Sequence, residues 1–234
     1  MGWDEIMNSD IPASAGIMSW RSSQFGIEAS HLKHEVIMAP QTNVYLDLMQ
    51  GDVINEAKVY NSVRLPKAYD FEPIPAGADP KYIRGGQANL WTEQIYNIRQ
   101  AEYMLWPRAF AIAESIWTPD DLKDWNKFVT RTETHFKRLD MAETKHSNAI
   151  YDPSITVSRN TASQLIATLT TEISGLDIYY SFDNSEPDRF YPKYTGALTV
   201  PKDAILLKLI TYRDNKPIGR MISFPIDLLQ KRIK

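Results

Sequence analysis

Aromatic residues followed by carboxylates are the features of this chain best suited to chemistry. Three segments have an aromatic residue and, two positions later, a carboxylate: Trp3 with Glu5, Tyr45 with Asp47, and Trp91 with Glu93. In an extended chain, positions i and i+2 face the same side, so each segment would present a flat apolar face beside a hydrogen-bond acceptor. Sugars are bound in this way, because their C–H faces pack on rings while their hydroxyl groups donate to carboxylates. Trp20, which ends the apolar run G-I-M-S-W, adds another ring.

The adjacent carboxylates Asp4 and Glu5 are a second candidate, because two carboxylates in different environments can act as an acid and a base. Neighbouring residues on a strand point to opposite sides. Only one of the two can therefore face the same side as Trp3. We predict structural or supporting roles for both rather than a catalytic pair.

The elements that would position these residues form a parallel α/β pattern. Residues 16–20 and 35–40 are short, apolar and typical of strands, and residues 26–33 between them are predicted to be helical. Residues 95–117 predict a long helix that Pro107 kinks or breaks. Strands that alternate with helices indicate βαβ units, and the functional side chains of parallel α/β barrels gather at the carboxyl ends of the strands.

A further helix is predicted from Thr118 to about Glu143. Thr118 has the chemistry of an N-cap, Pro119 suits the first helical position, and the next two aspartates suit the first turn. The sequence pattern typical of helices ends near residues 148–153.

The rest of the chain predicts an antiparallel β domain. Strand-like runs occupy residues 154–158, 164–171, 177–182, 204–213 and 221–227, and turn signals lie at 183–187, 195–196 and 214–219. This spacing is typical of a small β-sandwich. The sequence therefore predicts two domains, residues 1–150 and residues 151–234.

Composition restricts the remaining function classes. The chain is 43% hydrophobic and 24% charged with a net charge of −3, so it has no electrostatic footprint for nucleic acid. No apolar run approaches the length of a membrane span, and cysteine is absent. His31 and His34 are predicted to lie on a solvated helix, without the surrounding ligands of a metal site. We expect neither a metal nor a cofactor.

The ordered motifs resemble a known family. G-W-D-E-I, a strand ending in S-W-R, then N-V-Y-L-D and N-L-W-T-E closely resemble the second half of the catalytic domain of family 20 glycoside hydrolases, the β-N-acetylhexosaminidases. P-R-A-F-A-I-A-E-S-I-W is similar to the helix after the last barrel strand. I-Y-Y-S-F-D-N-S-E-P is similar to the fibronectin-III-like sandwich of bacterial members. The resemblance implies an α/β plus all-β fold: strands five to eight of a (β/α)8 barrel in residues 1–150, and the sandwich in residues 151–234.

This resemblance also implies an activity and a role for each candidate residue. Family members hydrolyse terminal β-linked GlcNAc or GalNAc with retention, and the substrate's own acetamido oxygen acts as the nucleophile. Three tryptophans would wall the sugar pocket: Trp3, Trp20 and Trp91. Tyr45 would donate a hydrogen bond to the acetamido oxygen, while Asp47 and Glu93 would accept bonds from the 4- and 6-hydroxyl groups.

The departures from the family pattern define what this chain lacks. No segment of residues 1–234 matches the family's H-x-G-G-D-E motif, which carries the proton donor and its aspartate partner, or its strand-one arginine. We therefore expect the C-terminal part of a longer, exported bacterial enzyme, inactive alone and associating through its exposed half-barrel into a homo-oligomer. The alternatives are a non-catalytic carbohydrate-binding protein that uses the same aromatic pocket, and a polypeptide without function.

Overall fold

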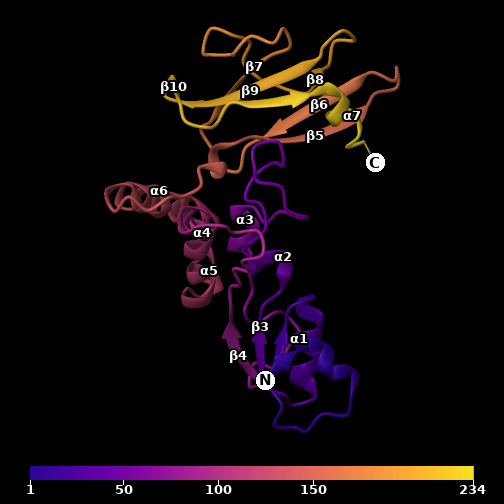
Figure 1. Ribbon diagram of the computed structural model, residues 1–234, viewed down its shortest axis with the longest axis vertical. Coiled ribbons are helices and arrows are strands. Elements are labelled where there is room, and N and C mark those ends of the chain that lie inside the picture. The colour runs from indigo at the N-terminus through magenta and orange to yellow at the C-terminus, as the bar shows by residue number, and fades with distance from the viewer. Residues whose placement is uncertain (234) are drawn as a thin grey trace. The chain divides into compact units, whose positions relative to one another are not determined.

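The computed structural model describes residues 1–233 (Figure 1). The chain forms two compact units: the first unit is Met1–Gln50 with Lys58–Ser147, and the second unit is Gly51–Ala57 with the chain from Asn148 onward. The second unit is therefore discontinuous in sequence. It takes up seven residues from the middle of the α/β part of the chain, in addition to the C-terminal strands.

A parallel sheet forms the base of the first unit. Its four strands are ordered β1-β2-β3-β4 and comprise β1 (Gly2–Trp3), β2 (Ile17–Ser19), β3 (Val36–Met38) and β4 (Ile83–Gly86). The strands predicted at 16–20 and 35–40 are present. Helix α1 (Ser23–His31) joins β2 to β3. It begins three residues earlier than predicted. Gly26 of α1 lies against β3, because a Cβ there would collide with the sulfur of Met38.

The remaining helices of the first unit follow β3 and β4. They are α2 (Gln41–Val44), α3 (Leu65–Tyr69), α4 (Ile98–Leu105), α5 (Arg108–Trp117) and α6 (Trp125–Met141), and Figure 1 shows α4, α5 and α6 in succession. The helix break predicted at Pro107 is confirmed, since it separates α4 from α5.

The predicted start of the last helix is wrong. Thr118 ends α5 instead, because its backbone N–H donates to the Glu114 carbonyl at 2.9 Å. A 3₁₀ turn follows at Asp120–Leu122. Helix α6 begins only after Asp124, whose side chain accepts the Lys127 N–H at 3.0 Å and serves as the N-cap.

Two antiparallel sheets share one hydrophobic core in the second unit. One sheet has the order β5-β6-β8, and in the other β9 pairs with β7, β10 and β11. Their bounds are β5 (Ser154–Arg159), β6 (Leu165–Thr170), β7 (Asp177–Ser181), β8 (Leu198–Thr199), β9 (Leu206–Arg213), β10 (Lys216–Pro217) and β11 (Ile222–Pro225). Both sheets contribute to the core, with Leu169 from one and Leu207 and Phe224 from the other. A short helix, α7 (Ile226–Gln230), was not predicted.

His34 was predicted to lie on a solvated helix, and this prediction is wrong. The helix itself is present, but it ends before His34. Helix α1 ends at His31, and Lys33 turns the chain with a φ of 67°. His34 is consequently buried, with Nδ1 3.0 Å from the Ala15 carbonyl oxygen. Within residues 1–233, no three side chains of the kinds that bind metals gather at one place, and no helix has the length and apolar character needed to cross a membrane.

Candidate active site

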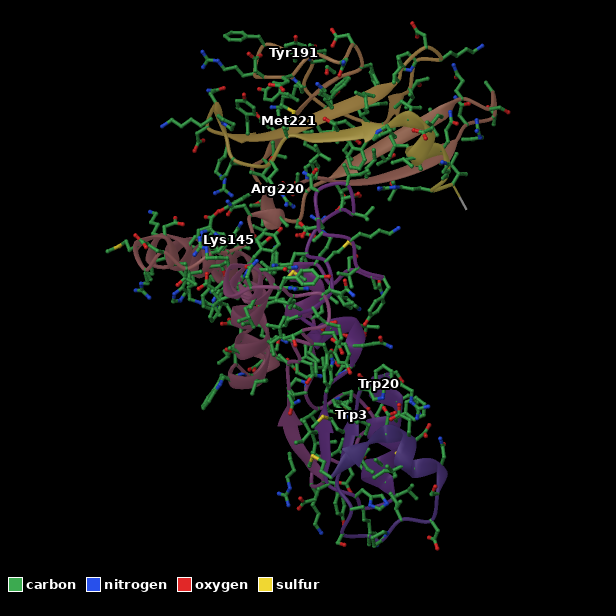
Figure 2. All side chains as sticks on the ribbon, in the orientation of Figure 1. Trp3, Trp20, Lys145, Tyr191, Arg220 and Met221 are labelled. Carbon is green, nitrogen blue, oxygen red and sulfur yellow. The ribbon has the colours of Figure 1, made fainter. Side chains whose placement is uncertain are left out.

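All six predicted site residues line one cavity of about 500 Å³ in the first unit. That volume lies within the roughly 300–1,000 Å³ range of small-molecule sites. Four further residues complete the lining. The full set is Trp3, Glu5, Trp20, Tyr45, Asp47, Val59, Tyr60, Trp91, Glu93 and Gln94. Figure 2 labels Trp3 and Trp20 on this unit.

The cavity residues come from chain segments that follow the parallel strands. Trp3 ends β1 and Trp20 directly follows β2. Tyr45 comes after β3 and α2, and Trp91 follows β4. The carboxyl ends of parallel strands meet at one edge of a sheet, which brings these residues together although up to 88 positions separate them in the sequence.

Four rings form a continuous series that we call the aromatic wall: Trp3, Trp91, Tyr45 and Trp20. The Trp3 and Trp91 centroids are 5.8 Å apart, and Tyr45 meets the Trp91 ring edge-on at 6.4 Å. Trp20 is stacked on Tyr45, with 6.2 Å between centroids and 15° between planes. These separations are typical of mutually stabilising aromatic pairs. The wall therefore presents an extended apolar surface to the cavity.

The three aromatic and carboxylate pairs line the same cavity, as expected, but only part of the extended backbone predicted for them is present. Tyr45 is extended and forms an isolated parallel bridge with Asn89, whereas Glu5 lies in a 3₁₀ helix (Asp4–Asn8) and Trp91 lies outside the strands. Asn89 positions Tyr45: its backbone N–H donates to the Val44 carbonyl at 3.0 Å, and its carbonyl accepts the Leu46 N–H at 2.7 Å. These two bonds flank Tyr45 and hold it beside the segment that leads to Trp91.

Asp4 has a structural role. Its carboxylate is fully buried and accepts the backbone N–H groups of Trp20 at 2.9 Å and Arg21 at 3.1 Å. The Arg21 Nε also donates to it at 2.5 Å. Asp4 therefore fixes the turn that follows β2 and so helps to place the Trp20 ring. Asp4 itself does not line the cavity.

Glu5 holds the Trp20 ring through its side chain. Its Oε1 accepts a hydrogen bond from the indole Nε1 of Trp20 at 2.9 Å. Both members of the Asp4–Glu5 pair thus bind the Trp20 segment, one through the backbone and one through the side chain. Glu5 also belongs to the cavity lining, which Asp4 does not.

Asp47 is a buried acceptor within the cavity lining. Burial raises the pKa of its carboxyl above the ordinary value, while backbone amides at Asp47 and Trp91 and the charge of Arg108 oppose the rise. Its Oδ1 is buried and has no hydrogen-bond partner among the described residues. The carboxylate therefore retains acceptor capacity, which buried oxygens normally use.

Tyr45 is held in its protonated form. Burial raises the pKa of its hydroxyl to about 12, a hydrogen bond with Trp91 opposes the rise, and the charge of Asp47 adds to it. A tyrosine with this pKa remains a hydrogen-bond donor throughout the neutral range. The cavity thus offers a donor at Tyr45 close to an acceptor at Asp47.

Arg108 supports the segment that carries Asp47 and was not predicted from the sequence. It is fully buried, and its guanidinium donates to the carbonyls of Leu46 at 2.6 Å and Leu48 at 2.8 Å, on either side of Asp47. It also donates to the carbonyls of Val63 at 3.0 Å and Met104 at 2.7 Å. A single arginine in an apolar helical stretch was the only signal available in the sequence.

Val59, Tyr60 and Gln94 are cavity residues that the sequence did not indicate. Tyr60 is 74% exposed, yet burial and the charges of Asp47 and Glu93 raise the pKa of its hydroxyl. It therefore lies close to both predicted acceptors. No carboxylate follows it two positions later, so it lacks the pattern that identified Trp3, Tyr45 and Trp91.

Comparison with known proteins identifies two family profiles and several similar proteins. The profile "Glycosyl hydrolase family 20, catalytic domain" matches residues 1–120, and "Fn3 associated" matches residues 167–226. The β-hexosaminidase of Porphyromonas gingivalis is 34% identical over 212 residues, which cover 88% of this chain and 27% of the relative.

Solved structures give the same family. A family 20 exo-β-N-acetylglucosaminidase from Vibrio harveyi, determined as an inactive mutant, is 33% identical with a TM-score of 0.58, over 62% of this chain and 24% of that one. The same enzyme in complex with N-acetylglucosamine is 31% identical with a TM-score of 0.55 over the same shares. The chain thus spans about a quarter of the length of these relatives. Because the catalytic-domain profile covers just over half of the 234 residues, the chain belongs to glycosyl hydrolase family 20.

Proposed function

We propose that this chain supplies the sugar-binding wall of a β-N-acetylhexosaminidase active site. The ligand would be a terminal, non-reducing, β-linked GlcNAc or GalNAc residue. One observation carries the proposal: the aromatic wall and the carboxylates Asp47 and Glu93 line a single cavity. The names of the relatives, β-hexosaminidases and β-N-acetylglucosaminidases, support the same substrate class.

Each group would have a distinct part in binding. The rings of Trp3, Trp20 and Trp91 would pack on the C–H faces of the sugar. The Tyr45 hydroxyl would donate to the acetamido oxygen and hold it for attack on the anomeric carbon. Asp47 and Glu93 would accept hydrogen bonds from sugar hydroxyls, and bonds to a charged partner contribute about 1.5–3 kcal/mol each.

The proton donor would come from residues outside this chain. Asp4 is buried and already accepts three hydrogen bonds, and Glu5 accepts one from Trp20. Asp4 and Glu5 are therefore not available to act together as the proton donor and its assisting aspartate. An H-x-G-G-D-E segment upstream would supply both groups, and the reaction would be retaining and substrate-assisted.

Sugar binding tests the proposal directly. Titration of the protein with N-acetylglucosamine and with N-acetylgalactosamine, followed by tryptophan fluorescence and calorimetry, is compared with titration with glucose. We expect binding of the acetamido sugars and none of glucose. Trp91→Ala is expected to weaken binding at least about tenfold, which corresponds to a loss of about 1.4 kcal/mol.

Trp117→Ala is the matched control, because Trp117 belongs to the first unit, is 85% exposed and does not line this cavity. Equal affinity of Trp91→Ala and Trp117→Ala would contradict the assignment of the wall. The engagement of Asp4 and Glu5 favours one alternative, a non-catalytic carbohydrate-binding protein. The coding sequence upstream of residue 1 separates the two: an H-x-G-G-D-E motif there supports the hydrolase.

A further inference from the structure

Glu93 and Gln94 line the candidate sugar cavity from a stretch of chain with little packing of its own. This stretch, here called the 91–97 segment, belongs to neither a helix nor a strand. All of its residues except Ile95 are exposed, and Ile95 is only half-buried. Burial therefore contributes little to the position of Glu93, and hydrogen bonds must hold the segment in place.

The two ends of the segment are fixed within the first unit. At its start, the Trp91 ring belongs to the aromatic wall, and the Trp91 backbone N–H donates to the Asp47 carboxylate. At its end, the Asn97 side chain accepts the Gln100 N–H at 2.9 Å and caps helix α4. The residues between these ends carry Glu93, and their place depends on further contacts.

The Gln100 side chain binds the middle of the segment at two points. Its Nε2 donates to the Gln94 carbonyl at 2.8 Å, and its Oε1 accepts the Tyr96 N–H at 3.1 Å. An amide that donates and accepts in this way pairs with the backbone on both sides of Ile95, much as a neighbouring strand would. The Ile95 N–H donates in turn to the Thr92 carbonyl at 3.1 Å, which closes a turn over the two residues between them.

Helix α4 (Figure 1) gives Gln100 a firm base in the first unit. Met104 of this helix is buried, and its carbonyl accepts a hydrogen bond from Arg108 at 2.7 Å. Glu102 of the same helix accepts the Lys145 N–H at 3.0 Å. The Gln100 amide thus connects an exposed segment to a helix that is packed and hydrogen-bonded at several points.

We propose that Gln100 is a positioning residue of the sugar site: its side-chain amide holds the 91–97 segment in the conformation in which Glu93 lines the cavity. Gln100 acts through Glu93, since it does not itself line the cavity. Without the two bonds, a bound sugar would have to order the segment, at a cost in affinity. The bond from a sugar hydroxyl to Glu93 rests on the proposed function, whereas the two bonds of Gln100 to the backbone do not.

Gln100→Met is the principal test, because methionine has a similar length and a high helix propensity but forms no strong hydrogen bond. Amide hydrogen exchange at Tyr96 is measured together with affinity for N-acetylglucosamine. We expect exchange at Tyr96 to rise at least about fivefold, while exchange in β3 stays unchanged. Affinity is expected to fall about three- to tenfold. Glu93→Ala is expected to weaken binding by more than this, at least about tenfold.

A double-mutant cycle shows whether Gln100 acts through Glu93. Once Glu93→Ala has removed the carboxylate, Gln100→Met has no acceptor left to misplace. The double variant is therefore expected to bind within about twofold of Glu93→Ala alone. Gln24→Met is the matched control, because Gln24 is exposed on α1, donates to Glu28 at 3.0 Å and does not line the cavity. No change in exchange or affinity is expected for it.

Three results would overturn the inference: unchanged exchange at Tyr96 in Gln100→Met, unchanged affinity in the same variant, and additive losses in the cycle. None of them contradicts the proposed function, because the wild-type protein would still bind the acetamido sugars. If the wild-type protein does not bind N-acetylglucosamine, the proposed function fails instead. Exchange at Tyr96 alone then decides whether Gln100 holds the segment.

Discussion

Replacement of Arg108 by methionine tests how the sugar site is supported. Arg108 is fully buried and donates to the carbonyls of Leu46, Leu48, Val63 and Met104. Methionine has a similar volume and is apolar, so the substitution removes the donors and the charge without leaving a large cavity. The four carbonyls would lose their charged partner.

The magnitude follows from these contacts. At about 1.5 kcal/mol for each bond from a charged donor, the four bonds contribute about 6 kcal/mol. Burial of the cation costs several kcal/mol and offsets part of this gain. Each buried carbonyl left without a partner costs about 1–3 kcal/mol, and we expect a net loss of about 4 kcal/mol for Arg108→Met. With a urea dependence near 2 kcal/mol per molar, the unfolding midpoint would fall by about 2 M.

Tryptophan fluorescence is the appropriate assay, because all six tryptophans belong to the first unit. Urea unfolding followed by this signal reports the unit that contains Arg108. Arg84→Met is the control, since Arg84 is 57% exposed and pairs with the exposed Glu35. No resolvable shift is expected there. A loss below about 1 kcal/mol for Arg108→Met would refute the reasoning, because apolar packing would then replace the four hydrogen bonds without cost.

Further predictions concern pH, turnover and assembly. Because the pKa of Asp47 is raised, its carboxylate takes up a proton at a pH above 3.8, the ordinary pKa of the group. Sugar affinity is expected to decline as the pH falls through that range. Asp47→Asn is expected to remove this pH dependence. The Tyr45 pKa of about 12 exceeds the ordinary 10.0, so the folded state binds the proton more tightly and stability falls as pH rises from 10 to 12. Tyr45→Phe is expected to remove that slope in alkaline unfolding. Residues 1–234 alone are expected not to hydrolyse an aryl β-N-acetylglucosaminide, and turnover abolished by Glu5→Gln would contradict this. Because β1 and β4 are unpaired sheet edges in the described residues, light scattering is expected to give a dimer or larger species, against 26.8 kDa for the monomer.

The aromatic and acidic residues of the site could be selected from the sequence because their order along the chain is informative. Trp3, Trp20, Tyr45 and Trp91 all follow short apolar segments that form or follow parallel strands, and that topology brings them together. The strand geometry predicted for them is only partly present, since Tyr45 is extended but Glu5 lies in a 3₁₀ helix. Tyr45 follows a short helix, and its place depends on the backbone of Asn89, a pairing of distant residues that no local pattern encodes.

The supporting residues could not be predicted for the same physical reason. Arg108 acts on carbonyls that lie up to 62 positions away, and carbonyls carry no side-chain signature. Tyr60 lines the cavity without belonging to a recognisable motif. The start of α6 was missed because Thr118 and Asp124 are both capable N-caps, and only the end of α5 decides between them.

The discontinuity of the second unit limits how this protein can be divided or recombined. A cut between Ser147 and Asn148 appears natural in the linear sequence, but it leaves Gly51–Ala57 on the wrong side. Ile54 would lose its apolar surroundings, and Asp52 and Glu56 would lose Arg232 and Arg220. Exchange of the C-terminal domain between homologues at that junction therefore needs Gly51–Ala57 to be exchanged with it. Such an exchange has three junctions, one on each side of Gly51–Ala57 and one before Asn148, and a single recombination event cannot supply them.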